Sequence, residues 1–281
     1  MRRVLLSLAL SLFIFIAHAQ EKFSFAFFTD LHLNANEKAR SYEGLEKAIV
    51  EAKKQKVDFI LTGGDNVDVD ALKADQQDKA RALFQGYKDI IERSKMNWFF
   101  TIGNHDRYWH TDGEYGSGLF SSFFGKTYYS LVHKGWKFIV LNSTEIVDGK
   151  YCISEKQIQW LKGELEKTPK NQPIIVSTHV PFLSLYYPVL EGRYTAADTF
   201  TNQKDIRSLF DTYNLKLVLQ GHQHLYEEIK VKGVQYITAG AISANWWGGN
   251  FHGTEEGFLK VTLKGNDFAW EYIDYGWTVN K

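Results

Sequence analysis

The strongest constraint on the fold of this 281-residue chain is a repeated pattern, in which an apolar stretch ends abruptly in polar residues. Five such stretches have the length and composition of buried β-strands, and each runs directly into a cluster of aspartate, asparagine or histidine. Apolar residues at helical spacing occupy residues 45–52 and 80–91, between the first three stretches. Alternation of strands with helices predicts an α/β protein in which helices are layered over a sheet.

The polar clusters lie where the predicted strands end. They are Asp30-Leu31-His32, Gly64-Asp65-Asn66, Gly103-Asn104-His105-Asp106, His179 within STHVPF, and Gly221-His222-Gln223-His224. In open α/β sheets, ligands gather at the carboxyl ends of the strands. We therefore expect the five clusters to meet at one edge of the fold.

The side chains in these clusters are of the kinds that bind metals. Carboxylate oxygens, amide oxygens and imidazole nitrogens suit zinc, manganese and iron. Each cluster alone is weak evidence, because a histidine at the end of a strand is more often a structural residue than a ligand. Together, the clusters supply enough ligands for two metal ions. Glycines precede three of the clusters, and they allow tight backbone turns beside a crowded centre.

The second half of the chain predicts further strands and helices. A hairpin turns near Lys134-Gly135, and Ser154 with Gln157 has the spacing of a capping box at the start of a helix. Residues 203–213 are expected to form another helix. Residues 227–276 are mostly strand and turn by their pattern, which suggests a second sheet packed against the first.

The ordered set of clusters resembles that of the calcineurin-like metallophosphoesterase family, which includes purple acid phosphatases and cyclic nucleotide phosphodiesterases. The resemblance extends from Asp30 to His224. It implies an α/β fold in the form of a four-layer αββα sandwich, with two mixed sheets flanked by helices. It also implies a phosphoric ester hydrolase, either a phosphatase or a phosphodiesterase, that acts on a small organic phosphate.

The resemblance further implies a binuclear centre for two divalent or trivalent transition-metal ions, which could be iron, manganese or zinc. The first ion would be held by Asp30, His32, Asp65 and His224, and the second by Asp65, Asn104, His179 and His222. Asp65 would bridge the pair, and a shared carboxylate with a bridging hydroxide brings two dications to about 3.5–4 Å. Hydroxide held on the metals would attack phosphorus.

Two residues of the third cluster have implied roles beside the metals. His105 resembles the catalytic histidine of the family, a general acid that donates a proton to the leaving oxygen. Asp106 would orient the His105 ring and favour its charged form; alternatively, Asp106 is a simple turn residue.

A competing hypothesis is a non-catalytic protein on the same fold that binds a metal or a partner. Such a protein should have lost one or more ligands or the catalytic histidine. This chain has kept the complete set, which favours the enzyme.

One position departs from the purple acid phosphatase pattern. Those enzymes carry a tyrosine iron ligand three residues after the bridging aspartate, and this chain has Asp68 there. The departure argues against a tyrosine-bound iron site, and we expect Asp68 to shape the loop. The segment GDNVD is closer to the pattern of cyclic nucleotide phosphodiesterases. Because that branch is usually cytoplasmic and this chain has the features of an exported protein, the branch stays open.

Aromatic residues follow several of the clusters. As candidates for substrate binding we take Asn104, Tyr108, Trp109, Trp246, Trp247 and His252, and a similar loop contains Tyr186 and Tyr187. Aromatic side chains in such loops can stack on a base or a sugar; equally, they can close the open end of the core. The loop cations best placed in sequence to meet a phosphate are Arg107 and Arg193, and the alternative for both is a solvated surface charge.

The N-terminus has the pattern of a cleaved signal peptide. An arginine pair precedes an apolar core of residues 4–16, which is too short to span a bilayer, and Ala-His-Ala then matches a cleavage site before Gln20. We expect residues 1–19 to be removed and residues 20–281 to form a single exported domain, periplasmic or secreted, with no stable membrane insertion. The alternative is an N-terminal membrane anchor.

Charge and cysteine content narrow the range of partners. The 33 acidic residues balance 33 basic ones, and loss of the two N-terminal arginines would leave the mature chain slightly acidic. This balance gives no support for a nucleic-acid partner, which needs an excess of basic residues. A single cysteine, Cys152, excludes an intramolecular disulfide. The expected partner is a small-molecule phosphate ester.

Overall fold

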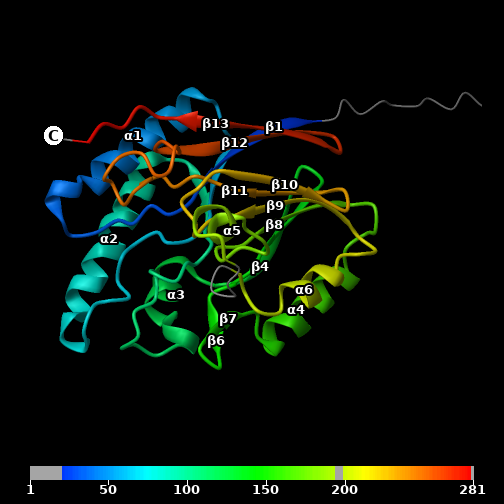
Figure 1. Cartoon of the computed structure of the whole chain (residues 1–281), viewed down its shortest axis with the longest axis horizontal. Helices are drawn as coiled ribbons and strands as arrows, with labels where there is room; N and C mark the ends of the chain where they lie inside the picture. The colour runs from blue at the N-terminus through cyan, green and yellow to red at the C-terminus, as the bar shows by residue number, and fades with distance from the viewer. Residues whose placement is uncertain (1–20, 194–198, 280–281) are drawn as a thin grey trace, which may run out of the picture.

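The computed structural model describes residues 21–193 and 199–279. The predicted signal peptide, residues 1–19, lies outside this part of the chain, so its cleavage and the export of the protein stay predictions. Two mixed β-sheets with helices on their outer faces make up most of the described structure (Figure 1). Within these described ranges, no helix has the length and apolar character needed to cross a membrane.

The first sheet has five strands in the order β13-β12-β1-β2-β3. It consists of β1 (Lys22–Phe28), β2 (Phe59–Thr62), β3 (Asn97–Phe99), β12 (Gly257–Lys264) and β13 (Asp267–Asp274). The strands β1, β2 and β3 are parallel, whereas β12 and β13 are added antiparallel along the other edge of β1. The polar clusters that follow the three parallel strands therefore lie at the same edge of this sheet.

The second sheet has six strands in the order β10-β11-β9-β8-β5-β4. It consists of β4 (Tyr129–His133), β5 (Trp136–Val140), β8 (Pro173–Ser177), β9 (Asn214–Gln220), β10 (Glu227–Val231) and β11 (Val234–Thr238). Its four central strands are parallel, and β4 and β10 pair antiparallel at the two edges. Both sheets are mixed, as expected.

Helices cover the outer face of each sheet, which makes four layers (Figure 1). The helices α1 (Ser41–Lys54) and α2 (Gln77–Ser94) pack on the first sheet through one apolar core. The helices α4 (Glu155–Glu166) and α6 (Gln203–Ser208) pack on the second sheet through another core. A third core lies between the two sheets. The predicted fold, a four-layer αββα sandwich, is therefore confirmed.

The strand β1 shows how the sequence produces these layers. Phe25 and Phe27 lie in the core between the sheets, whereas Ala26 and Phe28 lie in the core beneath the helices. Successive side chains of a strand point to opposite faces, and full burial of one phenylalanine stabilises the fold by about 1.5–3 kcal/mol. A strand that is apolar on both faces must therefore be covered on both, by a sheet on one side and helices on the other.

The hairpin and the two helices expected in the second half of the chain can be compared with the structure. The predicted hairpin near Lys134 is formed by β4 and β5. Ser154 is the N-cap of α4, and its hydroxyl accepts a hydrogen bond from the backbone N–H of Gln157 at 3.4 Å. The Gln157 amide, however, turns inward and bonds to the backbone of Asn142 at 2.9 and 3.0 Å. The helix expected over residues 203–213 ends at Ser208.

Short elements complete the described structure, and the sequence pattern predicted none of them because they are too short to show periodicity. They are α3 (Gly118–Phe124), α5 (Tyr186–Leu190), the hairpin of β6 (Glu145–Val147) and β7 (Lys150–Cys152), and 3-10 turns at Glu37–Ala39, Ala74–Gln76 and Glu114–Gly116.

Candidate metal centre

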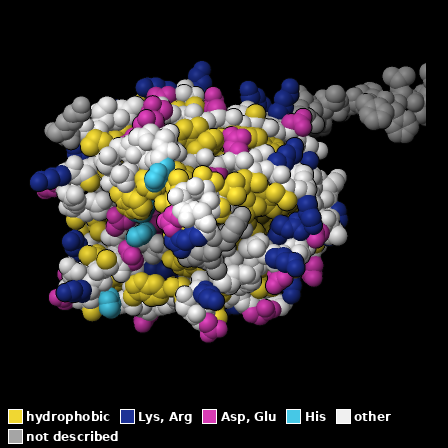
Figure 2. Space-filling view, viewed as in Figure 1, with side chains coloured by type: hydrophobic (Ala, Val, Ile, Leu, Met, Phe, Trp, Pro, Cys, Tyr) yellow, Lys and Arg dark blue, Asp and Glu magenta, His cyan; other side chains and the backbone are white. Residues whose placement is uncertain are grey.

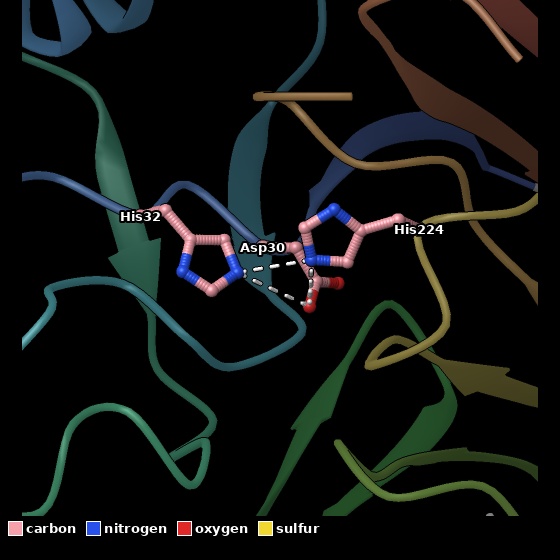
Figure 3. Close-up of side chains that lie close together, drawn as sticks. All are labelled: Asp30, His32 and His224. Atoms are coloured by element: carbon pink, nitrogen blue, oxygen red, sulfur yellow. Dashed lines mark hydrogen bonds and ion pairs between the residues drawn. The ribbon is translucent and has the colours of Figure 1, made fainter. Parts of the chain in front are cut away.

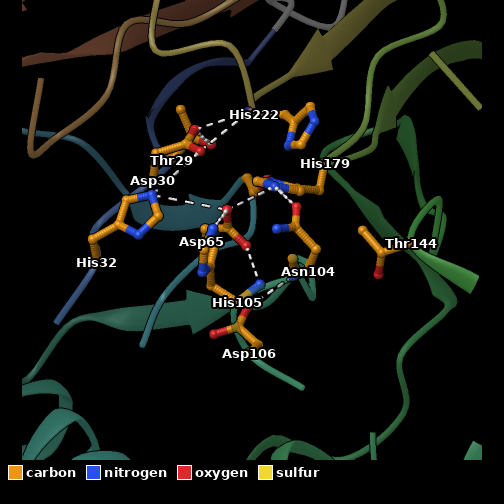
Figure 4. Close-up of polar contacts among 12 residues, drawn as sticks. Thr29, Asp30, His32, Asp65, Asn104, His105, Asp106, Thr144, His179 and His222 are labelled. Atoms are coloured by element: carbon orange, nitrogen blue, oxygen red, sulfur yellow. Dashed lines mark hydrogen bonds and ion pairs between the residues drawn. The ribbon is translucent and has the colours of Figure 1, made fainter. Parts of the chain in front are cut away.

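The carboxyl ends of strands from both sheets bring the predicted ligands together (Figure 4). In the first sheet, Asp30 follows β1, Asp65 follows β2, and Asn104 follows β3. In the second sheet, His179 follows β8 and His222 follows β9. The polar clusters therefore meet at one edge of the fold, as expected, and strands of both sheets end at that edge.

Three groups of side chains in the described part of the chain could hold a metal ion. Asp30, His32 and His224 form the first ligand cluster (Figure 3), Asp65, His179 and His222 form the second, and a third group of His32, Asp65 and His105 shares one residue with each. The Nε2 atoms of His32 and His224 lie 3.0 Å apart, and Nε2 of His224 lies 3.4 Å from Oδ1 of Asp30. Nε2 of His32 lies 3.9 Å from the same oxygen. All three side chains are buried. Their ligand atoms are close enough together to hold one metal ion.

The other ring nitrogen of each histidine shows that this cluster fits a cation. Nδ1 of His32 donates to the Asp68 carboxylate at 2.7 Å, and Nδ1 of His224 donates to the carbonyl oxygen of Ala244. A neutral ring that donates from Nδ1 has its lone pair on Nε2. Two lone pairs then face each other at 3.0 Å. This arrangement is unfavourable unless a cation or a proton lies between them, so the donor set fits a metal ion.

The second cluster consists of Asp65, His179 and His222, whose ligand atoms lie within 4.8 Å of one another. Nε2 of His179 lies 3.0 Å from Oδ2 of Asp65 and 3.1 Å from Oδ1 of Asn104. Nδ1 of His179 donates to the carbonyl oxygen of Gly63 at 2.8 Å, so its Nε2 is again the free ligand atom. This cluster has the composition of a second metal site.

Asp65 lies between the two clusters. Its Oδ2 atom is 3.0 Å from Nε2 of His179 and 3.8 Å from Nε2 of His32. Its Oδ1 atom accepts a hydrogen bond from the backbone N–H of His105 at 2.8 Å. Burial raises the pKa of Asp65, but the charges of His179 and His105 hold the pKa well below its ordinary value. An ionised carboxylate that faces both clusters fits the bridging role that the resemblance implies.

The backbone at the strand ends adopts the left-handed conformation at many of these residues. Such a conformation costs a non-glycine residue about 1–3 kcal/mol, and it is concentrated at functional sites. A sharp left-handed turn directs each side chain over the end of the sheet, where the other ligands lie. The positive φ angles are 54° at Asp30, 46° at His32, 51° at Asp65, 75° at His222 and 56° at His224.

Gly103 illustrates why glycine precedes these clusters. A Cβ atom at this position would lie 2.1 Å from both the backbone nitrogen and the Oδ1 atom of Asp65. No side chain fits at that distance, so the approach of the third cluster to Asp65 requires glycine. The expected crowding of the backbone is therefore present here.

The pKa values of two histidines suit metal ligands. Burial lowers the pKa of His222 to about 4, and repulsion from His179 adds to the decrease. Burial also lowers the pKa of His224 to about 4. Both rings are neutral near pH 7, the form in which imidazole binds a metal. Burial acts in the same direction on His179, but Asp65 raises its pKa to about 9, and a bound cation would oppose that proton.

His105 lies at the open side of the two clusters, with 32% of its side chain exposed. Its Nε2 atom is 4.0 Å from Oδ2 of Asp65, and its Nδ1 atom donates to Oδ1 of Asp70 at 2.9 Å. Burial alone would lower the pKa of His105, but Asp65 and Asp70 raise it to about 10. These carboxylates favour the charged form of the ring, and the ring lies within reach of a group bound between the clusters.

Asp106 does not occupy the place that we expected. Its carboxylate accepts hydrogen bonds from the backbone N–H groups of Gly103, Asn66 and Val67 at 2.8–2.9 Å, and also from the Asn66 amide. Burial raises the pKa of Asp106 to about 6, and repulsion from Asp65 contributes. The carboxylate thus holds the loops after β2 and β3 together, while Asp70 is the partner of His105. The turn-residue alternative is closer to the structure.

Asp68 and Asp70 support two different histidines of the centre. Asp68 contacts Nδ1 of His32, and Asp70 contacts Nδ1 of His105. The sequence pattern predicted a loop-shaping role for Asp68 and missed Asp70. The signal that could have identified them is their spacing, because residues two apart in an extended segment point to the same side.

Two aromatic candidates for substrate binding are buried instead. Tyr108 is fully buried, and its hydroxyl donates to the carbonyl oxygens of Lys73 and Ala74. Trp247 is also buried, and its Nε1 atom donates to the carbonyl oxygen of His32 at 3.2 Å. A Cβ atom on Gly44 of α1 would lie 2.0 Å from the Trp247 ring. Neither aromatic ring can contact substrate in this structure, and Trp247 supports the backbone of a ligand.

The remaining aromatic candidates are exposed. Trp246 is 47% exposed, and its ring stacks on His224 with centroids 4.1 Å apart. His252 packs against Phe251 at 4.6 Å, and Phe251 in turn lies 5.9 Å from His224. Trp109 is 45% exposed and packs over Gly116. Trp246 and Phe251 therefore border the first ligand cluster, and the sequence pattern had missed Phe251.

Arg107 and Arg193, the two loop cations considered as phosphate contacts, bind other groups of the protein. Arg107 is fully buried, and its guanidinium donates to Thr144 and Asn142, with Nη2 3.0 Å from Oδ1 of Asn142. Burial lowers the pKa of Arg107 to about 10. Arg193 is paired with Glu191 in an exposed ion pair. Arg107 is thus neither a solvated charge nor an open phosphate contact, but a buried tie between the loop after β3 and the chain after β5.

A family model agrees with this site. The model described as calcineurin-like phosphoesterase matches residues 23–226. The match includes every ligand in both clusters and His105.

Individual relatives point in the same direction. A 3′,5′-cyclic-nucleotide phosphodiesterase of Nostoc sp. is 26% identical over 224 residues, which cover 76% of each chain. A dimetal phosphatase of Danio rerio superposes with a TM-score of 0.66 at 14% identity, over 89% of this chain and 95% of that one. A purple acid phosphatase of yellow lupin superposes with a TM-score of 0.59 at 14% identity, over 91% of this chain and 52% of that one.

The two structural relatives share the fold at low identity, whereas the family model matches residues 23–226, most of the chain. The chain therefore belongs to the calcineurin-like phosphoesterase family and is a phosphoesterase.

Proposed function

We propose that the protein hydrolyses a small organic phosphodiester with the help of two transition-metal ions. The observation that carries the proposal is the pair of ligand clusters on either side of Asp65, with His105, held by Asp70, at their open side. Asp30, His32 and His224 would hold one ion. The other would be held by His179, His222 and Asn104.

The ions, when bound, supply charge that stabilises the transferring phosphoryl group and acidify a water that attacks phosphorus. The side chains of the protein orient the ligands and donate the proton to the leaving group. Nδ1–H groups that donate to Asp68, Gly63 and Ala244 keep the Nε2 atoms of the ligand histidines pointed inward. His105 would donate the proton of its Nε2 atom to the leaving oxygen, while Asp70 holds the ring.

The charge of the open side favours a diester over a monoester. Asp68 and Asp70 lie beside His105, and they are 27% and 32% exposed. These carboxylates repel the second negative charge that a monoester carries near neutral pH, and Arg107 is buried in other contacts. The cyclic-nucleotide phosphodiesterase among the relatives also acts on a diester, which supports the same choice.

The proposed function is tested with chromogenic esters and defined metals. We expect protein loaded with manganese, iron or zinc to hydrolyse bis(4-nitrophenyl) phosphate faster than 4-nitrophenyl phosphate, with two ions per chain by elemental analysis. Removal of the ions with a chelator should abolish hydrolysis, and adding them back should restore it. Undiminished hydrolysis by metal-free protein would contradict the metal requirement. Two bound ions without turnover of either ester would favour the non-catalytic alternative.

Asp70 and Asp106 give a matched pair of variants that tests which carboxylate supports His105. We expect Asp70→Asn to lower kcat about 10- to 100-fold with unchanged metal content, because His105 loses its charged partner. Asp106→Asn should instead destabilise the fold by about 1–3 kcal/mol, because an amide NH₂ would face backbone N–H donors. Metal analysis, kcat and thermal unfolding of both variants check this. If Asp106→Asn alone lowers kcat, at unchanged stability, the assignment is reversed.

We also propose that the enzyme is exported. The support is the arginine pair, the short apolar core and the small residues before Gln20. Mass spectrometry of the protein from the extracytoplasmic fraction should show a mature chain that begins at Gln20. An intact N-terminus in the membrane fraction would indicate an anchor instead.

A further inference from the structure

One border of the candidate metal centre is formed by Trp246. Its indole stacks on His224 with an interplanar angle of 27°, and it lies 5.5 Å from His32. Nearly half of the side chain remains exposed. The residue also adopts a strained left-handed backbone conformation, with φ of 47°, next to the buried anchor Trp247. The chain thus holds an exposed indole directly against two ligands of one cluster.

Phe251 and Tyr186 extend this border away from the ligands. The ring of Phe251 stands perpendicular to that of Trp246, with an interplanar angle of 89° and centroids 5.9 Å apart. Tyr186, from α5, lies nearly parallel to Phe251, with an angle of 16° and centroids 6.5 Å apart. Trp246, Phe251 and Tyr186 therefore form a continuous set of rings, which we call the aromatic wall.

Another border of the centre, in contact with the same His32 ring, has a different chemistry. It carries the partly exposed side chains of His105, Asp68 and Asp70. Figure 2 shows hydrophobic, histidine and acidic side chains close together on the face that is viewed. A substrate bound at the metals would therefore meet a polar side and an apolar, flat side.

We propose that the aromatic wall binds a planar aromatic ring on the arm of the diester that is not expelled. This inference rests on the proposed diester hydrolysis. A phosphodiester has two organic arms, and the arm next to His105 receives the proton and leaves. The retained arm can then extend toward Trp246, where its flat face stacks on the exposed indole. The class of substrate is a phosphodiester with a nucleobase or aryl group on its retained arm.

The test uses two diesters with the same leaving group and different retained arms. These are bis(4-nitrophenyl) phosphate, whose retained arm is an aromatic ring, and methyl 4-nitrophenyl phosphate, whose retained arm is a methyl group. For Trp246→Ala we expect KM for the aryl diester to rise about tenfold, the loss typical of one stacked ring. For the methyl diester, KM should change by less than about twofold. A nucleoside diester with the same leaving group distinguishes a nucleobase from an aryl preference.

The controls separate selection from damage to the metal site. Because Trp246 packs on His224, metal content is measured for every variant. Phe251→Ala changes the aromatic wall at a residue that lies farther from the ligand histidines, with its ring 5.9 Å from that of His224. Trp246→Phe should restore part of the affinity. Trp160→Ala removes an indole of α4 that packs against Tyr128, and this variant should change the KM of neither diester. Equal increases in KM for both diesters in Trp246→Ala and Phe251→Ala would overturn the proposal. Failure of the metal-loaded wild type to hydrolyse either diester would instead overturn the proposed function.

Discussion

His105→Ala is expected to lower kcat about 100- to 10,000-fold for a diester with a strongly basic leaving group, the contribution typical of a positioned general acid. The physical reason is the placement of the ring. Its Nδ1 atom is held by Asp70 at 2.9 Å, and its Nε2 atom lies 4.0 Å from the carboxylate that faces both ligand clusters. Without the ring, the leaving oxygen departs as an anion into a site that already contains several carboxylates.

Two diesters that differ only in the leaving group make this experiment sharp. Methyl phenyl phosphate releases the more basic phenolate, whereas methyl 4-nitrophenyl phosphate releases a stabilised anion that needs less help from an acid. The loss of kcat in His105→Ala should therefore be much larger for the phenyl ester, at unchanged metal content. A loss of the same size for both esters would mean that His105 does not protonate the leaving group. A loss of bound metal would show a structural role instead.

Asp65→Asn is expected to remove both metal ions and nearly all turnover. One oxygen of this carboxylate faces Nε2 of His179 at 3.0 Å and Nε2 of His32 at 3.8 Å. Loss of a supporting partner outside the ligand set typically costs about 10- to 100-fold in metal affinity, so loss of a shared ligand should exceed about 100-fold. Asparagine keeps the shape of the side chain but loses the charge that holds two cations together. Elemental analysis and metal titration measure the effect.

His222→Ala is the matched control for this prediction, because His222 belongs to one cluster only. This variant should lose one ion and keep the other, held by Asp30, His32 and His224. If Asp65→Asn retains two ions per chain, Asp65 is not the shared ligand. If both variants lose the same single ion, Asp65 serves only the cluster of His179.

The fold was predictable because it depends on patterns that a strand carries by itself. Apolar runs such as that of β1 require cover on both faces, and the helical spacing of residues 45–52 and 80–91 provides one of the covers. The convergence of the polar clusters was predictable for a related reason, whereas the assignment of ligands to two ions came from the resemblance to the family. Parallel strands of one sheet end at the same edge, so the residues after β1, β2 and β3 had to meet.

The support for the ligands was less predictable. Asp106 follows His105 directly in the chain, yet it binds backbone N–H groups of two loops, and the partner of His105 comes from Asp70 in another loop. Adjacency in the sequence does not identify the hydrogen-bond partner of a ligand here, because the chain turns sharply at each strand end. The side-chain direction after a left-handed residue cannot be obtained from a strand or helix period.

The burial of the two tryptophans after β11 could not be predicted from the sequence either. Trp246 and Trp247 are adjacent, and both follow the last metal-binding motif. The structure buries Trp247 between α1 and Trp277, with its ring against Gly44, and leaves Trp246 half exposed on His224. Both have positive φ angles, so no regular pattern distinguishes them. Only the shape of the surrounding layers decides which ring is covered.

By itself, the sequence determined the layered α/β sandwich, the ligand types and their convergence, since these follow from the apolar content, period and order of the strands. The tertiary structure alone decided which carboxylate holds which histidine, that Arg107 and Tyr108 are buried, and which aromatic rings border the site. The physical reason is that strand and helix periods specify faces of regular elements, whereas the site is built from irregular turns, where each side chain points in the direction that packing between distant segments allows.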